Sequence, residues 1–433
     1  MASVIPFKAL RPQPQFAPKV ASRPYDVLDS AEAKVEARGN PYSFLHITKS
    51  EIDLPENIDI HAADVYEKAK ENLDAFIQRG ILFQEDKACF YIYRLIMKGR
   101  SQTGLVCGSA INDYEKDIIK KHEFTRPEKE QDRINHIAYT HAQTGNVFLA
   151  YRNAAEIDDI INNWKSQHDP VYDFVADDEI RHTLWVINST EASNALVRLF
   201  KEKVPFTYIA DGHHRAASAA KVRKLLENAK PGENPGFSSR KSNITAQEED
   251  PADAVRSRDY FLTTLFPANE LHIMDYNRVI KDLGGLSAED FTQKLKKDFE
   301  VEEAGSSFTP SKPHEFGLYL NHKWHKLTAR PNTYTDDPIG VLDVTILSNN
   351  VLDKLLGIVD QRTDKRIDFV GGIRGSEELE RRVNSGEMAA AFSFYPVSIQ
   401  QLFDIADSGN VMPPKSTWFE PKLRDGLLTH LID

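Results

Sequence analysis

The chain is organised around residues 204–221, which read VPFTYIADGHHRAASAAK. Residues 205–210 are rich in aromatic and β-branched types, which predicts a short buried strand. The pair Asp211-Gly212 breaks this strand, and the alanine-rich segment from His213 to about residue 228 predicts a helix. The expected local structure is therefore a strand, a tight turn and a helix.

This turn has the chemistry of an anion site. Free backbone N–H groups at the positive end of a helix suit a phosphate or a carboxylate, and Gly212 lets the backbone approach it closely. Arg215 offers a planar donor fork, while His213 and His214 can exchange protons near neutral pH. The alternative is the solvated first turn of an ordinary alanine-rich helix.

Composition sets limits on the class of protein. A chain of 433 residues, 41% hydrophobic and 27% charged, is typical of a globular protein with two or three domains. Its net charge of −11 argues against nonspecific nucleic-acid binding. No apolar run reaches the roughly 18 residues of a membrane span, and the first residues lack a signal-peptide core. We expect a cytoplasmic protein without a membrane partner, in which Cys89 and Cys107 are buried reduced thiols.

A second polar cluster occupies residues 121–133, KHEFTRPEKEQDR. Its mixed charge, including His122, Glu123, Arg126 and Lys129, suits a loop that holds phosphate and offers a carboxylate base. The alternative is a salt-bridged surface helix. No second histidine follows His122-Glu123 at helical ligand spacing, so a zinc motif is not indicated.

Further candidates lie near the two ends of the chain. Arg23 and Asp26 close the proline-rich residues 1–30 and are possible site residues. Residues 412–422, MPPKSTWFEPK, carry Lys415 and Thr417, which could bind an anion; the alternative is a solvated, proline-stiffened tail.

Alternation of strand and helix across residues 181–228 predicts an α/β arrangement with at least one parallel pair of strands. Expected strands are 41–48, 88–97, 104–111, 147–152, 171–176, 181–187, 260–265, 271–276, 316–320, 324–328, 367–370 and 389–394. Expected helices are 30–38, 62–79, 115–121, 134–143, 190–203, 288–299, 341–351, 376–385 and 398–408.

Domain boundaries are expected around the Gly-, Pro- and Ser-rich residues 229–257. Residues 1–230 would form an N-terminal α/β domain, and 258–433 a C-terminal α+β domain that contributes the Lys-Ser-Thr tail. Residues 231–257 would be a mobile loop or lid over the site, or a plain interdomain linker.

Six motifs occur in an order that resembles one bacterial family, domain of unknown function 1015, over essentially the full length of the chain. They are Pro24-Tyr25-Asp26-Val27, Asn40-Pro41 with Ser43-Phe44-Leu45-His46, His122-Glu123 with Thr125, Asp211-Gly212-His213-His214-Arg215, Asp275-Tyr276-Asn277-Arg278, and Met412-Pro413-Pro414-Lys415-Ser416-Thr417. The family name itself carries no activity.

A second resemblance supplies a function. The Asp-Gly-His-His-Arg turn is similar to the nucleotide-phosphate motif of the ParB and sulfiredoxin-like fold, where free serine kinases bind donor phosphate with an Asp-Gly-His-x-Arg turn. It implies a mixed α/β fold: a ParB/sulfiredoxin-like phosphate-binding core with a second α+β domain. Some members of the family resembled here are expected to be serine kinases that use pyrophosphate. Fold alone does not fix function.

The implied activity is a free L-serine kinase that makes O-phosphoserine from pyrophosphate, ADP or ATP, with Mg²⁺. The roles implied are donor phosphate binding by Gly212, His213, His214, Arg215, Ser218, Arg126, Lys129 and Lys415; catalysis by Asp211, Glu123 and His213; serine binding by Arg23, Asp26, His122 and Thr417; and metal binding by Asp211. Arg126, Glu123 and Lys415 are expected to share one cleft with Arg215.

Two other classes of protein remain as alternatives. A ParB-like nucleotide-binding switch would use the same turn without kinase activity. A sulfiredoxin-like reductase would need a reactive cysteine at the turn, and none lies there. The sequence leaves a homodimer open.

Overall fold

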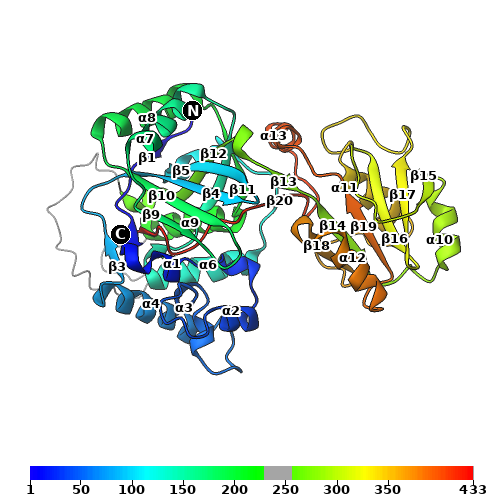
Figure 1. The fold of residues 1–433 in the computed structure, drawn as a ribbon, viewed down its shortest axis with the longest axis horizontal. Coiled ribbons are helices and arrows are strands. Elements are labelled where there is room, and N and C mark those ends of the chain that lie inside the picture. The colour runs from blue at the N-terminus through cyan, green and yellow to red at the C-terminus, as the bar shows by residue number, and fades with distance from the viewer. Residues whose placement is uncertain (229–255, 433) are drawn as a thin grey trace. The chain divides into compact units, whose positions relative to one another are not determined.

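The computed structural model describes residues 1–228 and 256–432, which form two compact units (Figure 1). The first unit contains Met1–Lys120, Phe124–Leu271 and Pro421–Asp433, and the second contains Lys121–Glu123 and His272–Glu420. This division differs from the expected boundaries because residues 260–267 pair with strands of the first unit and the last residues return to it. Nearly all of the expected lid at 231–257 lies outside the described residues.

The first unit alternates helices and strands. Its helices are α1 (Ala17–Val20), α2 (Ser30–Glu36), α3 (Leu45–Thr48), α4 (Ala63–Gln78), α5 (Ile111–Glu115), α6 (Pro127–Thr140), α7 (Ala155–Gln167), α8 (Thr190–Lys203) and α9 (His213–Asn228). Its strands are β1 (Val4–Ile5), β2 (Leu10–Pro12), β3 (Leu82–Gln84), β4 (Phe90–Met97), β5 (Arg100–Ala110), β6 (Ile119–Lys120), β7 (Ala142–Gln143), β8 (Val147–Tyr151), β9 (Tyr172–Val175), β10 (Arg181–Ile187), β11 (Thr207–Asp211), β12 (Tyr260–Pro267) and β21 (His430–Leu431).

Among the described strands, nine form the main sheet of the first unit, in the order β6-β11-β8-β12-β5-β4-β10-β9 with β1 added to β5. The pairs β6/β11 and β8/β12 are parallel, and the other neighbours are antiparallel. The expected parallel pairing is present, although β10 and β11 themselves are not neighbours. With 37% helix and 26% strand, the expected mixed α/β class is confirmed.

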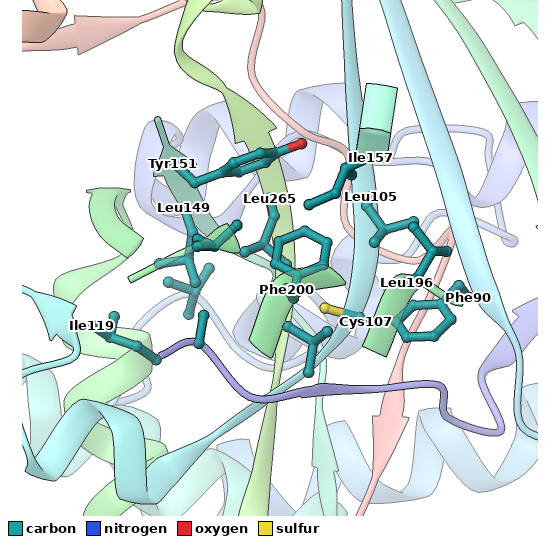
Figure 2. Close-up of a cluster of buried hydrophobic side chains, with 14 of the residues drawn as sticks. Phe90, Leu105, Cys107, Ile119, Leu149, Tyr151, Ile157, Leu196, Phe200 and Leu265 are labelled. Atoms are coloured by element: carbon teal, nitrogen blue, oxygen red, sulfur yellow. The ribbon is translucent and has the colours of Figure 1, made fainter. Parts of the chain in front are cut away.

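The main hydrophobic core fastens the site to this sheet. Figure 2 shows Ile157 of α7 and Leu196 and Phe200 of α8 packed among side chains of the strands. Ile209 of β11 and Ala216 of α9 belong to the same buried cluster. Burying one large aliphatic or aromatic side chain contributes about 1.5–3 kcal/mol. The strand before the turn and the helix after it are therefore both fixed by packing in this core.

The second unit is built on an antiparallel sheet of six described strands, in the order β15-β17-β16-β19-β14-β18. Its strands are β13 (Ile273–Met274), β14 (Tyr276–Ile280), β15 (Phe299–Ala304), β16 (Glu315–Leu320), β17 (Lys323–Ala329), β18 (Ile367–Gly371), β19 (Ala390–Phe394) and β20 (Trp418–Phe419). Its helices are α10 (Ala288–Leu295), α11 (Asp343–Leu347), α12 (Gly375–Asn384) and α13 (Ile399–Asp407), and a π-helical turn follows α11 at Ser348–Asp353.

Three expected elements are corrected by the structure. Residues 41–48 form a turn and the helix α3, not a strand, because Phe44 and Leu45 are both fully buried, in different clusters, so the segment has no alternating exposed face. The helix expected at 115–121 is not formed: α5 ends at Glu115, Asp117 adopts a left-handed φ of 56°, and Ile119–Lys120 form β6. Helix α6 begins at Pro127, a residue well suited to a first helical position, so half of the polar cluster at 121–133 is helical.

No helix in the described part of the chain combines the length and the apolar character that crossing a bilayer requires.

Candidate functional site

The candidate site lies where β11 ends and α9 begins, as the sequence predicts. Gly212 has a φ of +95°, a conformation that residues with a Cβ rarely adopt, and its carbonyl accepts the first helical bond at 3.0 Å from Ala216 N. The N–H groups that precede Ala216 in the first turn have no acceptor within their own helix. The turn therefore combines a positive helix end with a backbone that only glycine adopts easily.

Asp211 stands at the end of the strand and is bound by a lysine from the far end of the sequence. Lys422 Nζ lies 3.1 Å from Asp211 Oδ2. The Asp211 side chain is 32% exposed and that of Lys422 is 18% exposed, so the pair is reachable from solvent but partly shielded. A carboxylate and an ammonium thus lie together beside the turn.

Arg215 lies largely inside the first unit, which differs from the expected outward donor fork. Its Nη1 donates to Asn146 O at 2.6 Å, and its Nη2 forms an ion pair with Asp26 Oδ2 at 2.8 Å. Its guanidinium also lies over the Tyr25 ring, 5.4 Å from the centroid. The side chain is only 9% exposed, so Arg215 ties the N-terminal motif at Tyr25-Asp26 to the site helix.

The charges around Arg215 keep it protonated. Burial alone lowers the pKa of the guanidinium, but the acidic groups of Asp26, Tyr25, Asp211 and Asp425 together raise the pKa above its ordinary value.

Asp425 is a buried carboxyl group close to Arg215. Burial raises its pKa to about 7, although the charge of Arg215 opposes this shift. Asp425 Oδ2 and Arg215 Nε are both buried without a hydrogen-bond partner. A cavity of about 30 Å³, room for roughly one or two water molecules, is lined by Arg215, Tyr25 and Gly145 among others.

His214 links the turn to the second polar cluster. Its Nε2 accepts a hydrogen bond of 2.9 Å from Arg126 N, which requires a ring with its proton on Nδ1 when neutral. Burial lowers the pKa of His214, and the positive charge of Lys129 lowers the pKa further. Arg126 and Lys129 are both exposed. Three cationic or basic groups therefore flank the start of α9.

Two residues expected at the site serve other purposes. The Ser218 hydroxyl is fully buried and donates to Glu130 O at 3.1 Å, because it faces α6 from the second turn of α9. Arg23 Nε donates to Glu36 Oε2 at 2.6 Å at the side of a surface groove. We leave both out of the proposed site.

Four expected site residues belong to the second unit: His122, Glu123, Lys415 and Thr417. The backbone joins two of their motifs, since Met412 N donates to His122 O at 2.9 Å. Lys415 is exposed, and its carbonyl is held at 2.8 Å by Nη1 of the fully buried Arg278. The cleft expected to unite Glu123 and Lys415 with Arg215 and Arg126 stays a prediction.

Sequence reasoning missed Lys422, Asn146 and Asp425. The tail directed attention to Lys415, seven positions before Lys422, which follows Pro421. Asn146 contributes a backbone carbonyl and Asp425 a buried carboxyl group, and neither lies in a motif. The positions of Lys422 and Asp425 follow only from the return of residues 421–432 to the first unit.

The residues fit a weakly held Mg²⁺ better than a dedicated metal site. In residues 1–228 and 256–432, no group of three His, Cys, Asp or Glu side chains is placed to hold a metal. Mg²⁺ commonly keeps its waters and takes one or two carboxylates together with substrate phosphates. Asp211, partly exposed at the turn, would supply such a carboxylate.

The fold and this strand–turn–helix site define an α/β protein with a polar site at the start of a helix. The chain belongs to the family described as protein of unknown function (DUF1015), whose model matches residues 4–345. None of the curated proteins matches it.

Among solved structures, the chain is similar to a conserved hypothetical protein from Pyrococcus furiosus, with 13% identity, 75% of this chain and 94% of that chain covered, and a TM-score of 0.35. It is also similar to a free serine kinase in complex with AMP, with 12% identity, coverage of 75% and 92%, and a TM-score of 0.35. A third is SbnI from Staphylococcus aureus with a C-terminal truncation, with 9% identity, coverage of 74% and 85%, and a TM-score of 0.35. We draw nothing about ligands or activity from similarity at this level.

Proposed function

We propose that this chain transfers a phosphoryl group to the hydroxyl of a small amino acid, with free L-serine as the first acceptor to test. The observation that carries the proposal is the turn at Gly212, where a helix N-terminus, the carboxylate of Asp211 and the ammonium of Lys422 lie together. Phosphoryl transfer depends chiefly on positioning and charge stabilisation, and such a turn offers both.

The reaction moves the terminal phosphoryl group of pyrophosphate, ADP or ATP. The serine Oγ forms a bond to that phosphorus, and the bond from phosphorus to the bridging oxygen breaks. Orthophosphate, AMP or ADP leaves with the electron pair. The hydroxyl proton passes to a carboxylate, for which Asp211 in the first unit and Glu123 in the second are the candidates.

The remaining site residues divide into two roles in this proposal. Gly212, His213 and His214 present the helix start to the donor, and Arg126 and Lys129 add positive charge around it. Arg215 is largely buried and paired with Asp26, so in this proposal it acts on the phosphate through its charge and not by direct contact. His122 and Thr417 keep their proposed role in serine binding and Lys415 its proposed role in donor binding, and all three belong to the second unit.

Mg²⁺ would neutralise part of the charge on the donor phosphates when bound, with Asp211 as the proposed protein ligand. The chain's own contribution is the fixed turn, which keeps that carboxylate next to the helix start.

Phosphorus NMR of the full chain tests the proposal. The protein is incubated with Mg²⁺, a panel of amino acids, and pyrophosphate, ADP or ATP in separate samples. A phosphomonoester signal that appears only with serine, together with the matching leaving group, is the expected result. Omission of Mg²⁺ and omission of protein are the controls.

The rival class is a nucleotide-binding switch, and the same samples separate the two. A protein that binds ADP or ATP but transfers no phosphoryl group to any amino acid in the panel favours the switch. Transfer to a hydroxyl amino acid other than serine keeps the reaction class and changes the acceptor.

A further inference from the structure

The last described residues of the chain are firmly built into the first unit. Backbone pairs join Ser22 to Asp425, at 2.9 and 3.1 Å, and Leu10 to Thr429, at 2.9 Å in both directions. β21 then adds to β7. Arg424, 7% exposed at its side chain, forms an ion pair with Asp178. These anchoring contacts begin at Arg424, only two residues after Lys422, so they also fix the backbone at Lys422.

These anchors place the Lys422 ammonium against the turn. Its 3.1 Å contact with Asp211 Oδ2 spans 211 positions of the sequence, so no local preference of the chain produces it. An ammonium has three N–H donors on a flexible stem. A bond to Asp211 is therefore compatible with simultaneous donation to a phosphate oxygen at the same helix start.

The position of Arg215 gives Lys422 particular weight. The Arg215 guanidinium is committed to Asp26 and to Asn146 O inside the unit, so its fork does not extend into solvent. An anion at the turn beside Asp211 would also meet the repulsion of that carboxylate. A cation bound directly to Asp211 offsets this repulsion, and Lys422 occupies that place.

We propose that Lys422 is a phosphate-contacting residue at the Gly212 turn, delivered to it by the C-terminal segment 421–432. This inference rests on the proposed function for its ligand, a pyrophosphate or nucleotide phosphate.

Titration calorimetry of the full chain with pyrophosphate, ADP and ATP, each with Mg²⁺, tests the inference. Lys422→Gln should weaken donor binding by about 10- to 100-fold, the usual size of one hydrogen bond to a charged group. Lys422→Arg keeps the charge and should retain most of the affinity. Lys203→Gln is the matched control, because Lys203 also pairs with a carboxylate, Glu156, at 2.8 Å, but on α8.

Thermal melting of each variant checks that the fold is intact, and the kinetic split identifies the role. A rise in KM for the donor, larger than the fall in kcat, supports direct contact. Unchanged donor affinity in folded Lys422→Gln overturns the inference, and a fall in kcat alone would assign Lys422 to positioning Asp211.

The outcome separates this inference from the proposed function. Binding of pyrophosphate that depends on Lys422, without transfer to any amino acid, sustains the contact and overturns the kinase. If the wild type transfers the phosphoryl group and Lys422→Gln leaves donor affinity unchanged, the proposed kinase stands and the contact by Lys422 is overturned. A wild type that binds none of the three donors overturns both.

Discussion

Arg215 shows how a residue with the right chemistry can have a different orientation from the one its motif suggests. We expect Arg215→Ala to lower the free energy of unfolding by about 3 kcal/mol, because it leaves Asp26 and the buried Asp425 without their counter-charge. Activity should fall as well, since the turn loses its tie to Asn146. Urea unfolding and initial rates measure the two effects.

Arg181→Ala provides the comparison for Arg215. Arg181 also pairs with an aspartate, Asp173, but its side chain is 50% exposed, and exposed pairs contribute little. Its unfolding midpoint should stay close to that of the wild type. Equal midpoints for the two variants would contradict the structural role of Arg215.

His136 should make the first unit sensitive to acid. Burial and the charge of Arg133 lower its pKa from 6.5 to about 4, and its Nε2 donates to Ile47 O at 3.0 Å. Above pH 6.5 both folded and unfolded chains hold this ring neutral. Between pH 6.5 and 4 only the unfolded chain gains the proton. The free energy of unfolding therefore decreases as the pH is lowered, by up to roughly 3 kcal/mol. His136→Gln should remove this loss, as urea unfolding at pH 7.5 and 5 would show.

Asp425 should act in the opposite direction over the same pH range. Its folded pKa of about 7 lies above the ordinary value of 3.8, so the folded chain holds the extra proton and stability falls as pH rises from 4 to 7. Asp425→Asn should therefore gain stability relative to the wild type at pH 7.5 but not at pH 4.5.

At the scale of elements, the strand–turn–helix unit depends on the backbone of Gly212. Gly212→Ala should cost about 1–2 kcal/mol of stability because of its φ of +95°. An added Cβ would meet Val147 Cα at 3.4 Å, an ordinary contact, so the cost comes from the backbone. Donor affinity should fall too, because relief of this strain turns the N–H groups of the helix start. Calorimetry and urea unfolding measure both.

Gly80→Ala is the matched control for Gly212. Gly80 also has a left-handed backbone, with φ +66°, and nothing lies within 4 Å of an added Cβ. It closes α4, away from the turn in sequence, so it should lose similar stability and keep donor affinity. Equal loss of affinity in both variants would show that the effect is general destabilisation.

The sequence predicted elements best where pattern and burial agree. The limits of β10, α8 and α9 match the expected residues, because β10 contains a continuous apolar run, α8 has apolar residues at helical spacing and α9 is rich in alanine. The failure at 41–48 has a local cause: Ser43 Oγ accepts from Leu45 N at 3.3 Å, which starts a helical turn within an apolar run.

The candidate site was predictable only in part, because some of its contacts join segments that are distant in the sequence. The turn and its residue types follow from local sequence, and its contact with Asp26 joins two recognised motifs. The inward direction of Arg215 depends on Asn146 and Asp425, and the presence of Lys422 depends on a contact between distant segments. No periodicity in the sequence encodes those contacts.

At the scale of the molecule, the two units should differ in their ability to fold alone. Residues 272–420 contain a complete antiparallel sheet with its own core, so this fragment should give a cooperative thermal transition in circular dichroism. Residues 1–271 lack the segment from Pro421, including the buried Leu427, Leu428 and Ile432. Each such side chain contributes about 1.5–3 kcal/mol, so this fragment should be unstable.

Addition of a peptide spanning residues 421–433 to the 1–271 fragment is the corresponding rescue. Recovery of a cooperative transition in its presence would support the role of the segment. A stable 1–271 fragment without the peptide would contradict it.

The pairing of Leu10 and Ser22 with Thr429 and Asp425 also has a consequence for synthesis of the protein on the ribosome. Residues 272–420 are translated in between, which takes roughly 7–30 s at about 5–20 residues per second. During that interval the nascent first unit lacks its closing segment and leaves strand edges open to chaperones or to other chains. Because Lys422 is translated after residues 272–420, the proposed phosphate site would be completed well after the residues of the turn itself have been made.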